Sequence, residues 1–494
     1  MNGGQSIFDQ LRSLFGKSKE TKKPATPLPV PSKPKQPASG PASGHPSQQA
    51  TSPPPVSATP PVRNRPQPGT APEIDLILGI DFGTSCTKVV IGDHGWLGQS
   101  YAVPVGNGGD GLEYFLRPTQ ISVGRKSETN LKMRLMADPA SIKIQDLVTL
   151  YLADVIRDSL KWFSSEGPRR YADRKPVWSL NLGFPAKQIA EGPLVNAYRK
   201  IADLAARLGF SELSLDLASL SSLKDNPEAD SSRRSIPSAR IALYPEIAAQ
   251  LAGYVNSPYR AQGNLILVDV GAGTLDVSTA ILHGNDEEDV VSFHFCEVGL
   301  FGAMKLLEAR MAALETAVPG SVQIRLDDFQ SGTKPTPESV ALILGHQGQV
   351  ARESNDAFNT VSKDFAERSI LLAISCASQF RKLQRDVHSN PAFDPWPGQV
   401  RFFFTGGGSR LSFYQKHFID GPFEQQLSKF TRWKETEGDR RLHQQGLRLE
   451  PLPAPDDLQG LPADLAADFD RLSVAHGLAY GSENLMKITA SVHS

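Results

Sequence analysis

Cysteine and long apolar runs are both scarce in this sequence of 494 residues. The three cysteines, Cys86, Cys296 and Cys376, are too few and too widely spaced for a disulfide framework or a zinc site. No apolar run reaches the length of about eighteen residues that a membrane span needs, so the sequence predicts no transmembrane helix. The N-terminus lacks the continuous apolar core of a signal peptide. These absences favour a protein of the reducing cytoplasm.

Charge is nearly balanced overall but unevenly distributed. Residues 1–72 contain nine Lys or Arg and two Asp or Glu, a net charge of +7, which leaves −8 for residues 73–494 of a chain whose net charge is −1. An acidic folded part argues against a nucleic-acid partner. With 39% hydrophobic residues, that part is large enough to bury the cores of two lobes.

Acidic residues are absent from residues 24–72, which contain sixteen prolines among Ser, Ala, Thr and Gln. This composition cannot bury a core, so we expect a disordered, extended linker there. Ahead of it, residues 1–23 predict a short amphipathic helix followed by a basic segment. So short a helix is unstable alone in water; we expect it to dock on a partner protein, on the chain's own folded domain or, through residues 5–23, on a membrane surface. Its apolar stripe consists of Ile7, Phe8, Leu11, Leu14 and Phe15.

The segment LILGIDFGTSCTKVVIGD, residues 76–93, predicts two strands joined by a glycine turn. Asp81 stands at the end of the first strand, and Gly83, Thr84 and Ser85 follow it. A carboxylate, backbone N–H groups and hydroxyls in this order suit a phosphate chain that carries a divalent cation. Taken alone, the same residues could equally form a plain β-hairpin.

A second copy of this pattern, NLILVDVGAGTLDVSTAIL, occupies residues 264–282. An apolar strand ends at Asp269, and Gly271, Gly273, Thr274 and Asp276 follow. Two such units nearly two hundred residues apart suggest two similar half-domains that close on one nucleotide. A third glycine-rich element, RFFFTGGGSRLSFY from residue 401, would let a base or ribose lie close to the backbone.

From Glu73 onward, strand and helix signals alternate, which predicts a mixed α/β fold. We place the first lobe at residues 73–240 and the second at residues 241–494, the latter with a helix-rich region at about 300–390. No Walker A pattern occurs, which disfavours a P-loop NTPase.

In this order, the two phosphate loops and the glycine-rich loop resemble those of the superfamily of actin, sugar kinases and seventy-kilodalton heat-shock chaperones. Four further segments resemble the heat-shock chaperone ATPase domain: RPTQISV, LNLGFPA, VGLFGAMKLL and DRLSVAHGLAYG. The resemblance implies an actin-like ATPase fold, two lobes of duplicated ribonuclease-H-like subdomains around a nucleotide cleft. It also implies ATP or ADP with Mg²⁺ as cofactors. We expect no peptide-binding domain.

The resemblance also implies roles for individual residues. Hydrolysis would use Asp81, Lys132, Glu246, Asp269, Thr274 and Asp276, with Asp81 and Asp269 holding Mg²⁺ largely through water. Arg134 is the alternative to Lys132, and Asp276 could instead stabilise a turn. Glu246 follows Pro245 in reversed order relative to the chaperones, which puts the hydrolysis rate in doubt. The nucleotide would contact Gly83, Thr84, Ser85, Lys88, Gly271, Ala272, Gly273, Thr274, Arg381, Gly406, Gly407, Gly408, Ser409 and Arg410.

These patterns predict a chaperone-like ATPase that uses lobe closure as a nucleotide switch for a partner protein. The main alternative is an actin-like filament former or membrane-tethered cytoskeletal ATPase, which Lys88 supports because actins carry a basic residue at that spacing. The two remaining functional hypotheses are a metabolite kinase and a nucleotide-binding scaffold that hydrolyses ATP poorly. The pattern does not fix the oligomeric state.

Overall fold

The computed structural model describes most of the chain from residue 71 onward. The helix predicted in residues 1–23 and nearly all of the linker predicted in residues 24–72 lie outside the described residues. The described ranges are 71–93, 95–106, 108, 111–185, 192–226, 236–284, 289–329, 334–345, 350–387, 400–421, 423–425, 427, 447–450, 452–481 and 488–490; side chains are not described for 239, 284, 289, 290, 381–387 and 488–490.

The first sheet, sheet A, is built around the predicted strand–turn–strand unit. Its central strand β1 pairs antiparallel with β2 and parallel with β7, while β2 continues antiparallel to β3, and β7 continues parallel to β8. The strands are β1 (Glu73–Phe82), β2 (Cys86–Asp93), β3 (Gln99–Ala102), β7 (Lys175–Phe184) and β8 (Ile241–Pro245), with short β4 (Arg117–Pro118) on β2 and β14 (Leu458–Gln459) on β3.

The second sheet, sheet C, repeats this arrangement. Its central strand β9 is antiparallel to β10 and parallel to β12, β10 is antiparallel to β11, and β12 is parallel to β13. Both sheets therefore have the strand order 3-2-1-4-5 of the ribonuclease-H-like fold, and the predicted two-lobed α/β architecture is confirmed. The strands are β9 (Gly263–Val270), β10 (Leu275–Gly284), β11 (Asp289–Gly299), β12 (Val400–Thr405) and β13 (Leu447–Glu450), with β15 (Ile488–Ala490) on β11.

Side chains along β1 alternate between the two faces of sheet A, and helices α3 and α4 cover one of these faces. Leu76, Leu78 and Ile80 are buried in one cluster with side chains of α3 and α4. The alternate residues Ile77, Gly79 and Asp81 point to the opposite face. The helices of this lobe are α2 (Leu131–Ala137), α3 (Ile142–Ser165), α4 (Pro193–Phe210) and α5 (Leu217–Asp225), and a small hairpin pairs β5 (Ile121–Val123) with β6 (Lys126–Glu128).

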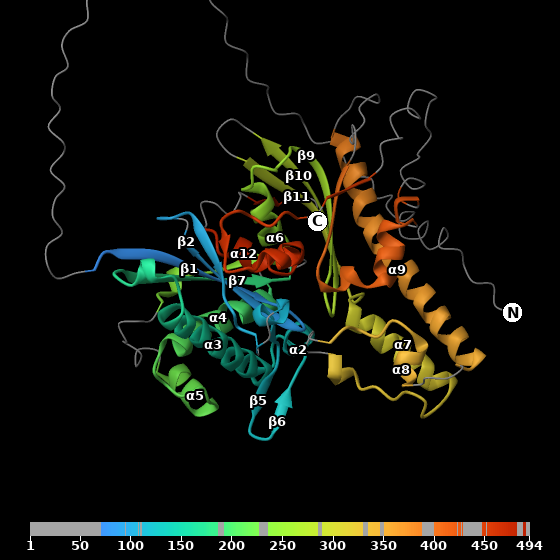
Figure 1. Ribbon diagram of the computed structural model, residues 1–494, viewed down its shortest axis with the longest axis horizontal. Helices are drawn as coiled ribbons and strands as arrows, with labels where there is room; N and C mark the ends of the chain where they lie inside the picture. The colour runs from blue at the N-terminus through green and yellow to red at the C-terminus, as the bar shows by residue number, and fades with distance from the viewer. Residues whose placement is uncertain are drawn as a thin grey trace, which may run out of the picture. The chain divides into compact units, whose positions relative to one another are not determined.

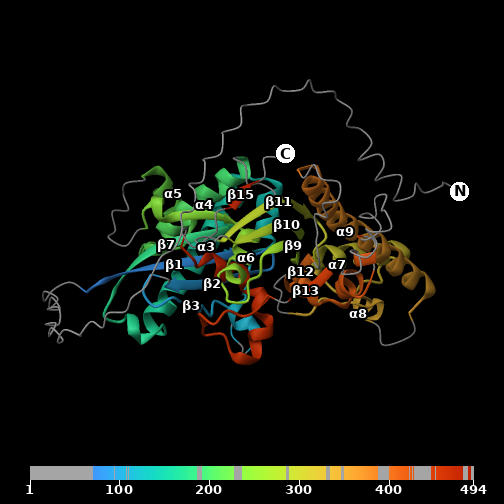
Figure 2. The same cartoon turned by 90° about the horizontal axis from the view of Figure 1, so that it is seen from above.

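The second lobe carries its own set of helices, and Figures 1 and 2 show α7, α8 and α9 together on the side of sheet C away from α3 and α4. Ile266 and Val268 of β9 are buried in one cluster with Ala373 and Ala377 of α9, and α9 contacts the neighbouring strands β10 and β11. This covering set consists of α7 (Ala303–Ala317), α8 (Val340–Leu344), the long α9 (Arg352–Val387) and short α10 (Ser412–Tyr414). Short segments of other helix types are η1 (Leu112–Phe115), η2 (Arg169–Tyr171), η4 (Ser238–Arg240), η5 (Leu326–Phe329), η6 (Gly407–Arg410) and η7 (Gln415–Ile419), and a longer 3-10 helix is η9 (Ala463–Arg471).

Two helices, α6 (Glu246–Val255) and α12 (Ser473–Leu478), lie between the two sheets (Figure 1). Apolar residues of α6 are buried with Leu265 and Leu267 of β9, while α12 packs on β1, β2 and β7 of sheet A. The two helices cross so closely that a Cβ on Gly477 would lie 1.7 Å from the backbone oxygen of Ala249. Only glycine permits this crossing, and the crossing joins the two lobes.

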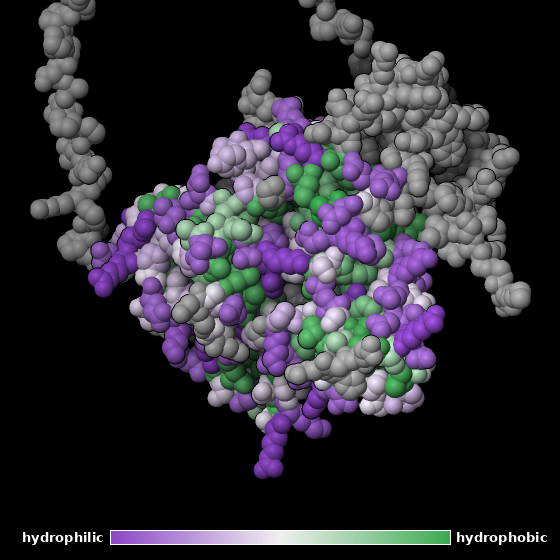
Figure 3. Space-filling view, turned by 45° about the vertical axis from the view of Figure 1, so that its right-hand side comes forward, coloured by the Kyte–Doolittle hydropathy of each residue, from purple (hydrophilic) through white to green (hydrophobic). Residues whose placement is uncertain are grey.

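The surface seen in Figure 3 intersperses hydrophilic and hydrophobic residues over the described part of that face. None of the helices within the described residues combines the length and hydropathy needed to span a bilayer.

Candidate functional site

A cavity of about 440 Å³ lies where the two lobes meet. Its walls come from the β1–β2 turn, the β9–β10 turn and the glycine-rich loop after β12, the three elements singled out in the sequence. Asp81 and Asp269 both line it, so the two strand ends do share one crevice. The predicted residues that line the cavity are Asp81, Gly83, Thr84, Ser85, Lys88, Lys132, Glu246, Asp269, Gly271, Ala272, Thr274, Asp276, Gly406, Gly407, Gly408 and Arg410.

Strand periodicity explains why both aspartates face the same space. In β9, Leu265 and Leu267 pack towards α6, and Asp269 is the next residue on that face. In β1, Asp81 lies on the face opposite Ile80, the face on which α12 packs. Each carboxylate therefore points towards the layer of α6 and α12 between the sheets.

Lys132 and Glu246 form an ion pair at the cavity wall. The Lys132 Nζ atom lies 2.5 Å from Oε1 and 2.8 Å from Oε2 of Glu246. Glu246 is the first residue of α6 and Pro245 its N-cap, so the reversed Pro–Glu order still directs the carboxylate into the site. Arg134, the alternative to Lys132, instead donates to Glu128 at 2.7 Å.

Lys88 also faces the cavity and is not an exposed strand lysine. Its Nζ atom donates to Oδ2 of Asp81 at 2.8 Å, and its side chain is 14% exposed. In the second lobe, the Thr274 hydroxyl donates to Oδ2 of Asp276 at 2.8 Å. Each strand–turn–strand unit therefore presents a carboxylate that is held by a neighbouring side chain.

Burial dominates the electrostatics of these groups. It raises the pKa of Asp269 to about 6, with the negative charge of Asp81 adding to the effect. It raises the pKa of Asp276 to about 7, again with neighbouring carboxylates contributing. Burial acts to lower the pKa of Lys132, but Glu246 outweighs it and the pKa is raised, so the ammonium stays charged. The site thus concentrates carboxylates that a cation would stabilise.

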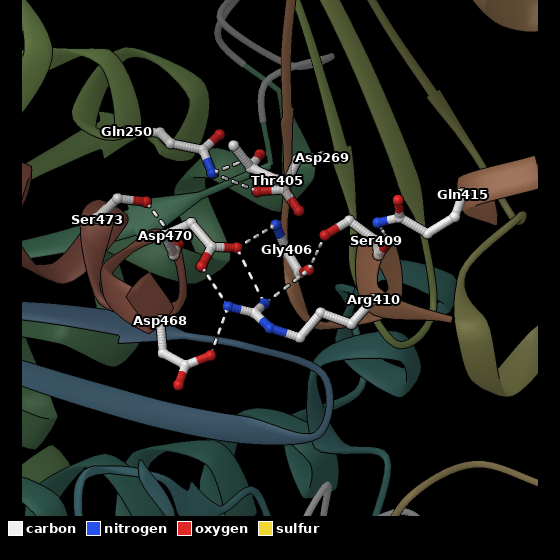
Figure 4. A network of polar contacts seen from close by, with 10 residues as sticks. All are labelled: Gln250, Asp269, Thr405, Gly406, Ser409, Arg410, Gln415, Asp468, Asp470 and Ser473. Atoms are coloured by element: carbon white, nitrogen blue, oxygen red, sulfur yellow. Dashed lines mark hydrogen bonds and ion pairs between the residues drawn. The ribbon is translucent and has the colours of Figure 1, made fainter. Parts of the chain in front are cut away.

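Arg410 lies in a network that ties the glycine-rich loop to the segment before α12 (Figure 4). Its guanidinium donates to Asp470 at 2.6 and 3.1 Å and to Asp468 at 2.7 Å. Asp470 also accepts from the backbone N–H of Gly406 at 3.2 Å. The arginine predicted to contact the nucleotide is therefore held by two carboxylates at the cavity edge.

Three predicted residues are not among the cavity-lining residues. Gly273 packs against Met133 and Thr84, where an added Cβ would lie 2.7 Å from the Met133 sulfur. Ser409 is buried, and its hydroxyl donates to the Gly406 carbonyl at 2.7 Å. The side chain of Arg381, on α9, lies outside the described part of the structure.

The cavity also contains side chains that the sequence patterns did not single out. Gln250 donates from Nε2 to Asp269 at 2.7 Å and to the Thr405 hydroxyl at 3.0 Å. Gln250 stands one helical turn after Glu246 in an otherwise apolar helix. Because residues four apart share one helix face, this spacing could have predicted that Gln250 faces the same site as Glu246. The other unassigned polar or large lining residues are Met304, Phe329, Lys334, Thr336, Glu338, Asp470 and Arg471.

The donor set fits a magnesium-bound polyphosphate. Mg²⁺ is usually held by one or two carboxylates together with phosphate oxygens and water, and the buried Asp81 and the half-buried Asp269 both face this cavity. The glycine-rich loop packs directly against one of these carboxylates: Gly406 has φ +86°, and a Cβ there would lie 2.2 Å from Oδ1 of Asp269. Asp81 and Asp269 are the residues that would hold the cation, and its charge would offset their mutual repulsion.

Comparisons with known proteins find a distant likeness among solved structures but no related sequence. No protein-family model and no curated protein matches the sequence. Among solved structures, the chain is similar to one described as "pCBH ParM non-polymerisable quadruple mutant", with a TM-score of 0.41 and 13% identity over 82% of this chain and 98% of that one. The fold assignment therefore rests on strand order and direction, and the resemblance to heat-shock chaperones stays a prediction.

Replacing Asp276 by Asn should stabilise the protein at neutral and alkaline pH when nucleotide and divalent cations are absent. The folded-state pKa of Asp276 is raised to about 7, above its ordinary value near 4, so its ionisation costs stability as pH rises from about 4 to about 7. The advantage of the variant should therefore grow across that range, reach on the order of 2–4 kcal/mol, and stay constant above it. Urea unfolding at several pH values measures this, and an advantage that does not change with pH would contradict it.

Proposed function

We propose that this protein binds Mg²⁺ with ATP in the cavity between its lobes and hydrolyses it. One observation carries the proposal: Asp81 and Asp269, at equivalent strand ends of two sheets with the same topology, line a single cavity. In this proposal, the turns after the two strands bind the phosphates, and the loop at residues 406–408 lies against the nucleoside. Lys88 and Lys132 supply the positive charge that phosphoryl transfer needs.

The proposed hydrolysis places a water molecule between the phosphate and the groups at the cavity wall. Glu246 and Thr274 orient that water, and the charged Lys132 stabilises the phosphate oxygens as negative charge develops. A bound cation would neutralise charge on the phosphates. Helix α6 carries both Glu246 and Gln250, and Gln250 donates to Asp269. A ligand that shifts these side chains when it binds therefore also shifts α6, which lies between the lobes.

We propose that nucleotide binding therefore acts as a switch of lobe closure that a partner protein reads. The mechanical link is the packing of α6 against β9 and β12 of sheet C and of α12 against sheet A, because the two helices contact each other at the Gly477 crossing. This chaperone-like hypothesis predicts that a partner protein captured from the native host by the full-length protein with Mg²⁺ and ATP should be released when ADP replaces ATP. Equal capture of the partner with ATP and with ADP would contradict the hypothesis of a nucleotide switch.

Replacing Thr274 by Ala should slow ATP turnover at least tenfold and leave the affinity for Mg²⁺ with ATP within about twofold. Its hydroxyl donates to Asp276 inside the cavity, so its loss changes the water site more than the phosphate loops. Isothermal calorimetry with a slowly hydrolysed ATP analogue measures binding, and phosphate release measures turnover. Unchanged turnover would remove Thr274 from the mechanism, whereas a wild-type protein that binds no nucleotide would refute the proposed function.

A filament-forming, actin-like ATPase is the second candidate. The observation in its favour is the contact of Lys88 with Asp81 inside the cavity, because a basic residue at this spacing is the feature that actins and many sugar kinases share. Sedimentation and electron microscopy of the full-length protein with Mg²⁺ and ATP distinguish the two candidates. Nucleotide-dependent filaments favour the second candidate, and a protein that stays monomeric at every concentration excludes it.

A further inference from the structure

Arg471 lines the cavity but has no part in the hydrolysis proposed above. It is the last residue of η9, and it is half-buried. Within the described part of the chain, no hydrogen bond or ion pair holds its guanidinium. An arginine carries five N–H donors and a permanent charge, and such groups in protein interiors almost always have partners. The free donors of Arg471 therefore point to a ligand.

The other cations of the cavity wall are either paired or exposed. Lys88, Lys132 and Arg410 each form an ion pair with a carboxylate. Lys334 has no such pair among the described residues, but it is exposed. Arg471 thus combines partial burial with a charge that no carboxylate of the described chain neutralises.

The guanidinium of Arg471 lies flat against the glycine-rich loop. A Cβ added to Gly407 would lie 3.0 Å from Cζ, 3.1 Å from Nε and 3.3 Å from Nη1 of Arg471. Because the central carbon is the nearest of these three atoms, the group turns its face towards the glycine rather than its N–H edge. The N–H donors are therefore not used by this contact, and glycine is the residue that leaves room for it.

The backbone that carries Arg471 is held in place by its neighbours (Figure 4). The side chain of Asp470 accepts from the N–H of Gly406 at 3.2 Å and from the guanidinium of Arg410 at 2.6 Å. The Ser473 hydroxyl donates to the Asp470 carbonyl at 2.7 Å. A side chain positioned in this way before binding loses less conformational entropy when it contacts a ligand.

The chemistry of the free donors favours a phosphate as their ligand. A guanidinium matches the charge and the oxygen spacing of a phosphate, whereas a base stacked on its open face would leave the N–H donors unsatisfied. Arg471 shares the cavity with Cys86 of the β1–β2 turn. Burial raises the pKa of the Cys86 thiol, and the positive charges of Lys88 and Arg471 act against that rise.

We propose that Arg471 binds the phosphate chain of the nucleotide through its N–H donors and so makes the cavity select a nucleoside polyphosphate over a nucleoside. This inference rests on the proposed function and adds a binding residue to it. Lys88 and Lys132 must give up ion pairs to reach a phosphate, whereas Arg471 gives up none. Arg410, the arginine that the sequence assigned to the nucleotide, stays with its carboxylates.

The test compares Arg471→Gln with a matched control, Arg240→Gln. The control removes the same charge from a surface pair with Asp75 at 2.7 Å, away from the cavity. Calorimetry with Mg²⁺ and a slowly hydrolysed ATP analogue should show a loss of affinity of at least tenfold for Arg471→Gln and at most about twofold for Arg240→Gln. Competition by adenosine should change by no more than about twofold in either variant. The Tm of ligand-free Arg471→Gln should not fall, because no ion pair is lost.

Ionic strength gives a readout that does not depend on adenosine. The ratio of wild-type to Arg471→Gln affinity should shrink as KCl rises from about 0.05 M to about 0.5 M, because salt screens a contact between charges. Arg471→Lys keeps the charge without the planar fork, so it should lose more than about twofold but less than Arg471→Gln. This second variant carries the test if the glutamine variant does not fold.

The outcomes separate this inference from the proposed function. The role of Arg471 is overturned by a loss below twofold, by an equal loss for adenosine and the ATP analogue, or by a loss that salt leaves unchanged. In each of these cases a wild-type protein that binds Mg²⁺ with ATP leaves the proposed function intact. A wild-type protein that binds no nucleotide refutes both.

Discussion

Replacing either Asp81 or Asp269 by alanine should abolish measurable binding of Mg²⁺ with ATP, with a loss of affinity of at least a hundredfold, about 2.7 kcal/mol. The two carboxylates line one cavity, and burial together with their mutual repulsion raises the pKa of Asp269 to about 6. A divalent cation relieves that repulsion, so each carboxylate contributes to cation binding, and the cation in turn holds the phosphates. Isothermal calorimetry with a slowly hydrolysed ATP analogue and Mg²⁺ measures the loss.

The matched control is Asp75→Ala, on the same strand as Asp81. Asp75 is exposed and pairs with Arg240 at 2.7 Å, away from the cavity, so its loss should leave the affinity within about twofold. A second check is the response to chelation. EDTA should weaken nucleotide binding by the wild type and have no further effect on Asp269→Ala. Retention of magnesium-dependent binding by Asp81→Ala and by Asp269→Ala would refute the proposal that these two residues hold the cation.

The strand ends that carry these aspartates were predictable because their signals are local. Buried β-branched residues, an acidic strand end and an immediate glycine turn stand within a few residues of one another in β1–β2 and in β9–β10. Their repetition predicted two similar sheets, and pairing around β1 and β9 confirms this. Helices were expected in the same part of the chain because strand and helix signals alternate from Glu73 onward, and α3, α4, α6 and α9 lie there.

What could not be predicted depends on contacts between distant segments. The two-residue strand β14 joins sheet A beside β3, although more than 350 positions separate Ser100 from its partner Leu458. Two residues are too few to show a period. Asp470 holds Arg410 from sixty positions away, and neither residue carries a local mark of that pairing. Lys132 and Glu246 were each proposed separately, but only the packing of their elements brings them within 2.5 Å.

At Gly477, local helix propensity and tertiary packing predict opposite effects of a substitution. By helix propensity alone, Gly477→Ala should stabilise α12 by roughly 1 kcal/mol. The crossing with α6 predicts the opposite, because the new Cβ would lie 1.7 Å from the backbone oxygen of Ala249 and 2.5 Å from its carbonyl carbon. Backbone atoms cannot move aside as a flexible side chain can. We therefore expect the packing effect to exceed propensity and the free energy of unfolding to fall by at least about 3 kcal/mol.

The affinity for Mg²⁺ with ATP should fall in the same variant, because α6 carries Glu246 and Gln250 to the cavity. Urea unfolding and calorimetry measure the two effects. Gly95→Ala is the matched control, since a Cβ there would meet no atom within 4 Å, and both quantities should stay near wild type. If Gly477→Ala were as stable as Gly95→Ala, the two helices could not cross at this distance. The link between the lobes on which a nucleotide switch depends would then have to lie elsewhere.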